Sequence, residues 1–395
     1  MCRGAPTNRD GDSKSISMPD VHKLEANEHL LRIQAHVAMD AVAQQRALTE
    51  RLANTRLGEL GQKILEATLA HQADGKAGCE DVLAHIAAGV DAACQVLGLD
   101  VQKGIVKGVL PIPGLGAISS DFYGTGIAIV AIEASLVPFT GMLTDLLAES
   151  FEYRHTADGL AVVLDADACA MKITGGKSLS ESHLDAVEGR ETLVHSWERF
   201  FLHFAGLSFP WPDSKLTEAQ SAMKFQLTSA MEVFVVAHEY GHHINRHNAG
   251  ASAASSVLPD DALRHEFEAD RLAWAIARYL GAAGFAGRLT RVRNTWMESS
   301  AGAVAYLAAA DLVRRVREIL QTGSAETRRS QTHPPLDDRL EALDHWNGFD
   351  GDPEPLRTEF RNQRSFLRNL LGNIYNYLVP KFNAAHKAGY RPTHL

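Results

Sequence analysis

Residues 238–242, His-Glu-Tyr-Gly-His, have the types and spacing of a metal-binding motif. His238 and His242 are four residues apart, so a helix through this stretch would bring both imidazoles onto one face. In the HExxH pattern two such histidines bind zinc, and the glutamate beside the first acts as general base on a water molecule. We therefore expect metal-assisted hydrolysis, with His238 and His242 as zinc ligands and Glu239 as the catalytic base.

A third ligand is needed, because a catalytic zinc ion usually has three protein ligands and keeps one position for water. The extended pattern HExxHxxGxxH does not supply it, since asparagines stand at its Gly and final His positions. Glu266 is the better candidate, because the chain between His242 and Glu266 is long enough to fold a second helix back onto the first. Asp270, one helical turn later, could accept the outer N–H of a ligand histidine and fix its tautomer. Two His and one Glu with an open position favour one zinc ion as the cofactor.

These assignments have simpler alternatives. The two histidines could face solvent with incidental spacing, and the two carboxylates could form a surface pair beside Arg271. A fourth ligand, either His243 or His247, would close the site and make the metal structural instead of catalytic.

A downstream motif, THPPLDDRLEAL at 332–343, follows HExxH and the EFEADR stretch at 266–271 in order. The three motifs together resemble the gluzincin metallopeptidases related to the heat-shock protease HtpX and the CAAX prenyl proteases. The resemblance covers about residues 225–345. It implies a zincin-like fold, zinc binding by Glu266 and a place for Asp270 beside the ligands.

The resemblance also points to His333 and Arg339, which match the His-Pro and Arg of the family's downstream motif. We expect His333 to act in catalysis as a hydrogen-bond donor to the developing oxyanion. We expect Arg339 to anchor the loop of His333 through the carboxylate of Asp270 or Glu268. The family's usual Asn-Ala-Phe strand, which commonly lies along the substrate, has only a loose counterpart in residues 159–173.

The motifs need two helices that pack together. Thr217 and Gln220 have capping-box spacing and predict the start of a helix that runs to about residue 247. A loop at 248–259 precedes a second helix, predicted over 260–281. We assign the zincin-like metallopeptidase domain to residues 151–350, with strands at 160–173 for a small sheet. Its other predicted helices span 182–206, 291–321 and 335–346, and a C-terminal helix occupies the segment 351–395.

The first 150 residues are expected to be a disordered tail at 1–20 and a helical, possibly regulatory region at 21–150. Helices are predicted within 21–74 and at 80–98. The apolar stretch 124–143 is interpreted as a buried core helix, because Glu133 and Pro138 interrupt it. The alternative is a membrane-associated hairpin within 104–148. The expected fold class is mainly α (α+β), with a small sheet in the catalytic domain.

The net charge and the cysteine content of the chain argue against some classes of function. The net charge of −9 argues against nucleic acid as a partner, because phosphate contacts need clustered Lys and Arg. The four cysteines form no CxxC pair, as expected for reduced cytoplasmic thiols. The prediction is a cytoplasmic zinc endopeptidase that hydrolyses protein or peptide substrates with a metal-activated water. The alternatives are a non-catalytic, metal-stabilised helical interaction protein and a membrane-associated protease.

Overall fold

The computed structural model describes residues 21–35, 79–101, 104–112, 114–122, 125–156, 159–174, 193–207, 215–246, 259–284, 293–324, 333–346 and 352–392. The expected tail at 1–20, the helices predicted between residues 36 and 74, and His247 with the loop after it lie outside these ranges.

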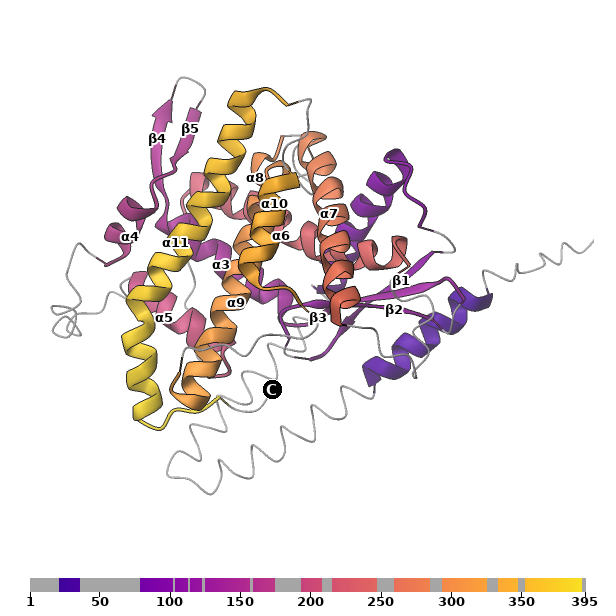
Figure 1. The fold of residues 1–395 in the computed structure, drawn as a ribbon, viewed down its shortest axis with the longest axis horizontal. Coiled ribbons are helices and arrows are strands. Elements are labelled where there is room, and N and C mark those ends of the chain that lie inside the picture. The colour runs from indigo at the N-terminus through magenta and orange to yellow at the C-terminus, as the bar shows by residue number, and fades with distance from the viewer. Residues whose placement is uncertain are drawn as a thin grey trace, which may run out of the picture.

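Helices dominate the described chain, and a small sheet lies at one end of the molecule (Figure 1), which confirms the predicted fold class. Helices over residues 21–35 and 79–96 come first. The later helices are α3 (Leu136–Ser150), α4 (Ala166–Thr174), α5 (Leu193–Phe204), α6 (Glu218–Ile244), α7 (Pro259–Ala282), α8 (Thr295–Glu298), α9 (Ala301–Thr322), α10 (Leu336–Trp346) and α11 (Glu354–Lys387).

The sheet has the strand order β1-β3-β2, with β1 (Ile105–Leu110) parallel to β3 (Ala128–Glu133) and β2 (Ala117–Asp121) antiparallel to β3. One face packs on α6, and the 21–35 helix covers the other through Leu30 and the amide of Gln34, which donates to Val109 O. A separate hairpin, β4 (Glu152–Thr156) and β5 (Gly159–Val163), lies at the opposite side of the molecule (Figure 1).

The helix predicted for 124–143 is wrong. Residues 128–133 form β3, and a helix begins only at Leu136. β3 is the central strand and its apolar side chains are buried on both faces, so its sequence is a continuous apolar run without the alternation that marks a half-buried strand. The 21–150 region is therefore not wholly helical. None of the described helices is long and apolar enough to cross a membrane.

Two other predicted elements are divided in the structure. The strand expected over 160–173 ends at Val163, and α4 follows after Asp165, whose carboxylate accepts the Ala168 N–H at 2.9 Å as a helix cap. The helix expected over 291–321 is split into α8 and α9 at Ser300, which has a left-handed backbone with φ of 63°. The remaining helices agree with prediction to within a few residues where both are described.

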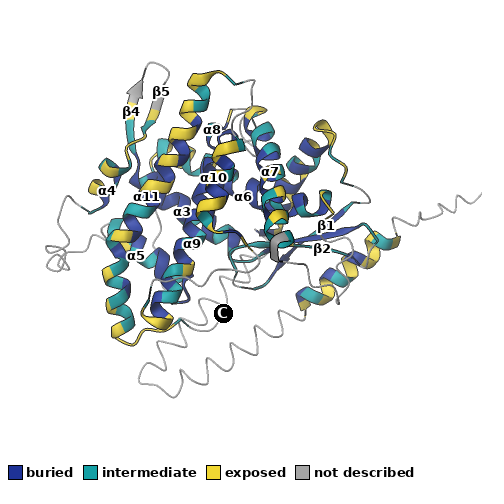
Figure 2. Ribbon diagram, viewed as in Figure 1, coloured by how far each residue is buried: buried dark blue, intermediate teal, exposed yellow. Residues whose placement is uncertain are grey.

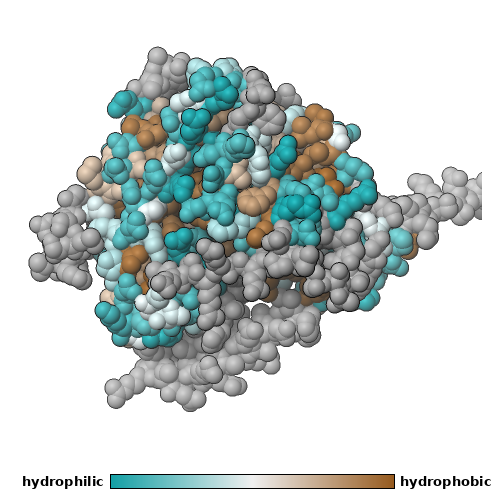
Figure 3. Space-filling view, in the orientation of Figure 1, coloured by the Kyte–Doolittle hydropathy of each residue, from teal (hydrophilic) through white to brown (hydrophobic). Residues whose placement is uncertain are grey.

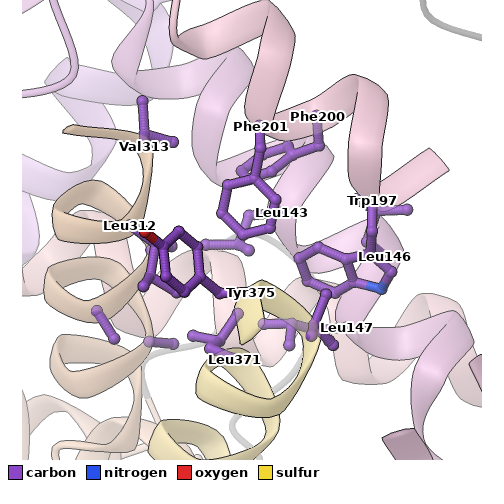
Figure 4. Close-up of a cluster of buried hydrophobic side chains, with 14 of the residues drawn as sticks. Leu143, Leu146, Leu147, Trp197, Phe200, Phe201, Leu312, Val313, Leu371 and Tyr375 are labelled. Carbon is purple, nitrogen blue, oxygen red and sulfur yellow. The ribbon is translucent and has the colours of Figure 1, made fainter. Parts of the chain in front are cut away.

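The apolar core has two large parts that meet along α6 and α9. Figure 4 shows the first part, where aromatic residues of α5 such as Trp197, Phe200 and Phe201 pack between α3, α9 and α11. The second part joins α6 and α7 to the sheet and the 79–96 helix. The second half of α6 is mostly buried, whereas α11 alternates between buried and exposed positions along its length (Figure 2). Polar side chains cover much of the face seen in Figure 3, and apolar ones form separate patches.

Candidate metal centre

The HExxH motif lies in the last two turns of α6, which is a long helix fixed at both ends. At its start, the Thr217 hydroxyl accepts the Gln220 N–H and the Gln220 side chain accepts the Thr217 N–H, which is the predicted capping box. The run Val233–Ala237, just before the motif, is buried in the second part of the core. The backbone that carries His238 and His242 is therefore anchored in the core by the turns that directly precede it.

Helix α7 reaches the motif because Gly241 has no side chain. A Cβ at Gly241 would lie 2.8 Å from the Ala269 Cα and 2.9 Å from the Ala269 carbonyl oxygen, closer than atoms can approach. The two helices therefore touch backbone to backbone at this point. Glu266 and Asp270 lie on either side of Ala269 along α7, so the close approach brings both carboxylates to the histidines of α6.

His238, His242 and Glu266 form the candidate metal cluster. The two Nε2 atoms are 3.1 Å apart, His238 Nε2 is 3.5 Å from Glu266 Oε2, and His242 Nε2 is 3.4 Å from Glu266 Oε1. Tetrahedral zinc with ligand bonds of about 2.0–2.1 Å separates its donor atoms by about 3.3 Å. The three donor separations therefore fit one zinc ion.

One oxygen of this cluster lacks a hydrogen-bond donor. Glu266 Oε2 is buried and has no partner, since 3.5 Å to His238 Nε2 is at the limit of a hydrogen bond. An unpaired buried carboxylate oxygen is costly, and a bound cation would remove that cost. The donor set therefore fits a divalent metal better than it fits a network of protein hydrogen bonds.

Asp270 lies behind the cluster and connects three helices. Its Oδ1 is 2.9 Å from Nδ1 of His238, so this nitrogen donates and Nε2 is left for the cluster. Arg339 of α10 holds the same carboxylate with two N–H groups, at 2.7 Å from Nε to Oδ2 and 2.5 Å from Nη2 to Oδ1. Of the two carboxylates considered for Arg339 in the sequence, the structure pairs it with Asp270.

Glu239 and His333 flank the cluster in different environments. Glu239 is 7 % exposed and within electrostatic reach of both histidines. His333 has a side chain that is 59 % exposed, with its Nε2 3.8 Å from Glu266 Oε2. The structure therefore brings all seven predicted site residues into one region: His238, Glu239, His242, Glu266, Asp270, His333 and Arg339.

The charges of the site are strongly coupled. Burial alone would lower the pKa of His238, but its hydrogen bond to Asp270 and the nearby Glu266 raise it to about 10. Burial would raise the pKa of Glu266, yet the adjacent imidazoles bring it below its usual range. The pKa of Asp270 is likewise lowered, because Arg339 outweighs burial. The carboxylates that draw a proton onto His238 would also attract a metal cation.

The pKa of Glu239 is raised, unlike the pKa values of Glu266 and Asp270, which are lowered. Burial raises it, and the nearby imidazoles offset this only in part. A carboxylate with a raised pKa can both accept a proton and release it again near neutral pH.

His243, considered as a fourth ligand, lies on another side of α6. Its Nε2 is 3.0 Å from the Val101 carbonyl oxygen, and within the described residues it is not part of the metal cluster. The cluster found there has three protein ligands, the number that a catalytic zinc site usually has.

Sequence reasoning missed Tyr306 of α9, which lies within electrostatic reach of Glu239 and Arg339. It also missed β2, which packs along α6. Neither carries a motif, and β2 with the sequence AISSD has little strand character of its own.

Two ligand helices, a three-membered donor set and an adjacent buried glutamate define the class of this site: a zinc metallopeptidase centre of the HExxH type. Comparison with protein-family models agrees, because residues 226–347 match the model of peptidase family M48, a family of zinc metallopeptidases. The match begins within α6, covers the HExxH motif and all of α7, and ends just after α10. No curated protein and no solved structure matched the chain.

Proposed function

We propose that this protein is a zinc-dependent endopeptidase that hydrolyses peptide bonds of protein or peptide substrates. The observation that carries the proposal is the unpaired buried Oε2 of Glu266, set within 3.5 Å of a histidine nitrogen and beside Glu239. One zinc ion is the cofactor, held by His238, His242 and Glu266.

Zinc, when bound, supplies Lewis acidity, which polarises the peptide carbonyl and acidifies water. Glu239 accepts the proton of the attacking water and passes it to the amine that leaves. Its burial excludes bulk water from this transfer and keeps its pKa raised. Asp270 keeps the Nδ1 proton on His238, so that Nε2 retains its lone pair for the metal.

His333 is the proposed donor to the oxyanion of the tetrahedral intermediate. Its position 3.8 Å from Glu266 and its large exposure leave it at the solvent side of the cluster, where a substrate carbonyl would enter. The part of the ring that faces the cluster is shielded from solvent, which lowers the pKa of His333, so the neutral imidazole with one N–H is the form that donates. Arg339 is a positioning residue, since it acts through Asp270.

An extended substrate is proposed to lie along β2. This strand is at the edge of the described sheet and packs on the helix that carries the HExxH motif. The stretch 159–173, considered as the substrate strand in the sequence, instead contributes to the β4–β5 hairpin and to α4. A closer kinship to HtpX and the CAAX proteases and a cytoplasmic location remain part of the proposal. The 151–350 domain is proposed as the unit that carries the zinc ligands, and β2, upstream of it, is proposed to contribute the substrate-binding edge.

The test is hydrolysis of fluorescein-labelled casein by the purified protein, with zinc measured on the same samples. Glu239→Gln should reduce hydrolysis by about 1,000-fold or more and keep one zinc per chain, because it removes the base and leaves the ligands. Glu268→Gln, an exposed acid of α7, is the matched control and should behave as the wild type.

Zinc at one per chain without cleavage of any peptide would favour the non-catalytic, metal-stabilised protein. Recovery of the protein with membranes after cell fractionation would favour the membrane-associated alternative. Loss of zinc in Glu239→Gln would contradict the role given to Glu239.

A further inference from the structure

The tripeptide Gly114–Leu115–Gly116, which leads directly into β2, is held by two side chains from distant parts of the chain. The carboxylate of Glu133, at the end of β3, accepts a hydrogen bond from Gly116 and lies against Gly114, and Tyr306 from α9 donates a hydrogen bond to the leucine between them. This contact set is independent of the metal cluster. We call it the 114–116 clamp.

Glu133 replaces a backbone partner at the end of the sheet. The Glu133 N–H donates to Gly116 O at 3.0 Å, as expected for the antiparallel pairing of β2 and β3. The Gly116 N–H does not return to the Glu133 backbone but donates to the Glu133 carboxylate at 2.7 Å. A Cβ at Gly114 would lie 1.9 Å from the same carboxylate, so only glycine leaves room for it.

Tyr306 holds the remaining residue. Its hydroxyl donates to Leu115 O at 2.8 Å, and its ring lies edge-on to Phe139 with 6.2 Å between centroids. Burial raises the pKa of Tyr306, so the hydroxyl keeps the proton that it donates. A buried tyrosine hydroxyl aimed at a loop carbonyl fixes that loop to the helix which carries it.

The clamp links the beginning of β2 to the catalytic region. Tyr306 lies on α9, which packs on the helix that carries Glu239, and it is within electrostatic reach of Glu239 and Arg339. Ala117, the first residue of β2 after the clamp, packs on the apolar cluster that contains the buried run of α6. A shift of the tripeptide would therefore move the edge strand relative to Glu239.

From this geometry we infer that Glu133 and Tyr306 are positioning residues for the substrate. They hold β2 in place beside the metal cluster. An extended peptide bound along β2 then presents its scissile bond to Glu239. This inference rests on the proposed peptidase function. Neither Glu133 nor Tyr306 belongs to one of the three sequence motifs.

The first arm of the test measures hydrogen exchange in the full-length, zinc-loaded protein for peptides covering residues 114–121. Tyr306→Phe and Glu133→Ala should speed exchange in this segment by about 10-fold, the factor expected for one lost hydrogen bond of about 1.4 kcal/mol. Glu133→Gln keeps an acceptor oxygen and should restore slow exchange. Tyr153→Phe is the matched control, because Tyr153 donates to the Ala148 carbonyl at 3.0 Å in α3. Unchanged exchange in both Tyr306→Phe and Glu133→Ala would overturn the clamp.

The second arm separates positioning from general stability. With fluorescein-labelled casein, Tyr306→Phe should raise KM by about 5-fold with kcat within about 2-fold and zinc content unchanged, since binding geometry is lost and the base and ligands remain. A KM equal to that of Tyr153→Phe, together with faster exchange, would show that the segment does not position substrate.

Casein binding, followed by fluorescence anisotropy in a Glu239→Gln background, keeps the test independent of catalysis. A weaker Kd in the Tyr306→Phe, Glu239→Gln double variant than in Glu239→Gln alone supports the role of Tyr306 in placing a bound polypeptide, whether or not the wild type cleaves casein, so failure of the peptidase proposal and failure of the clamp give different results. Casein affinity that is equal with and without Tyr306→Phe, or absent altogether, overturns the inference.

Discussion

The Asp270 carboxylate lies 2.9 Å from Nδ1 of His238, on the side of the ring opposite the metal cluster. This contact determines which nitrogen of His238 carries a proton, and Arg339 from a third helix keeps the carboxylate charged and in place. Metal-binding histidines commonly donate their other N–H to a carboxylate, and that contact tunes the affinity for the metal. The α6, α7 and α10 helices are therefore joined through the site itself.

Asp270→Asn should weaken zinc binding by about 10- to 100-fold, because the acceptor for His238 is neutralised. It should also destabilise the fold by about 3 kcal/mol, since Arg339 loses its buried partner. Zinc affinity measured by competition with a chromophoric chelator, and urea unfolding, check both effects. Asp338→Asn, an exposed acid on α10, is the control. Unchanged zinc affinity in Asp270→Asn would contradict the role of this contact.

Glu266→Gln should abolish the thermal stabilisation that zinc gives. A ligand that binds only the folded state stabilises it by about 2.7 kcal/mol at 100 times its Kd, and a neutral amide is a poor substitute for the carboxylate. Unfolding temperatures with added zinc chloride and with a chelator provide the measurement. The wild type and Glu268→Gln should show a large difference between the two conditions. An equal difference in Glu266→Gln would remove Glu266 from the ligand set.

Gly241→Ala should lower both stability and zinc affinity, because the new methyl group meets the Ala269 backbone at 2.8 Å and must push α7 away. Overpacking of this kind costs about 1–3 kcal/mol. Gly372→Ala in α11 has open space around its Cβ and should instead stabilise the protein slightly, through better helix propensity. Urea unfolding of the two variants gives the comparison, and equal stability would rule out the tight α6–α7 contact.

Glu232→Gln should make the protein more stable than the wild type at pH 8. Glu232 is buried between α6 and α3, where its Oε1 is 2.9 Å from the Thr140 hydroxyl, and burial raises its pKa to about 7. The pKa of Glu232 in the folded protein lies above its ordinary value of 4.5. The contribution of this group to the free energy of unfolding is therefore fully present below about pH 4.5 and is lost as the pH rises to 7.

The expected loss for the wild type between pH 5 and pH 8 is about 2–3 kcal/mol from this group. Urea unfolding of both proteins at the two pH values isolates the effect, because other titrating groups are common to them. A difference in stability that does not change with pH would refute the assignment of a neutral, buried Glu232.

Local patterns were sufficient for the motif and for most of the described helices, but not for α3, α4 or the break between α8 and α9. The capping box at Thr217, the four-residue spacing of His238 and His242, and the matching spacing of Glu266 and Asp270 all follow from helix geometry over one turn. The sheet could not be found in this way. β3 lacks alternation because it is buried on both faces, and β2 is a strand because it pairs with β3, which its own sequence does not indicate.

By itself, the sequence determined the chemistry: which side chains can bind zinc, which can act as base, and that each pair lies on one face of a helix. Only the tertiary structure decided how those pairs meet. The contact of Gly241 with Ala269, the choice of Asp270 by Arg339, and the clamp of Glu133 and Tyr306 on residues 114–116 join segments that are far apart in the chain. Such contacts depend on packing among several elements at once, and no spacing within one segment can specify them.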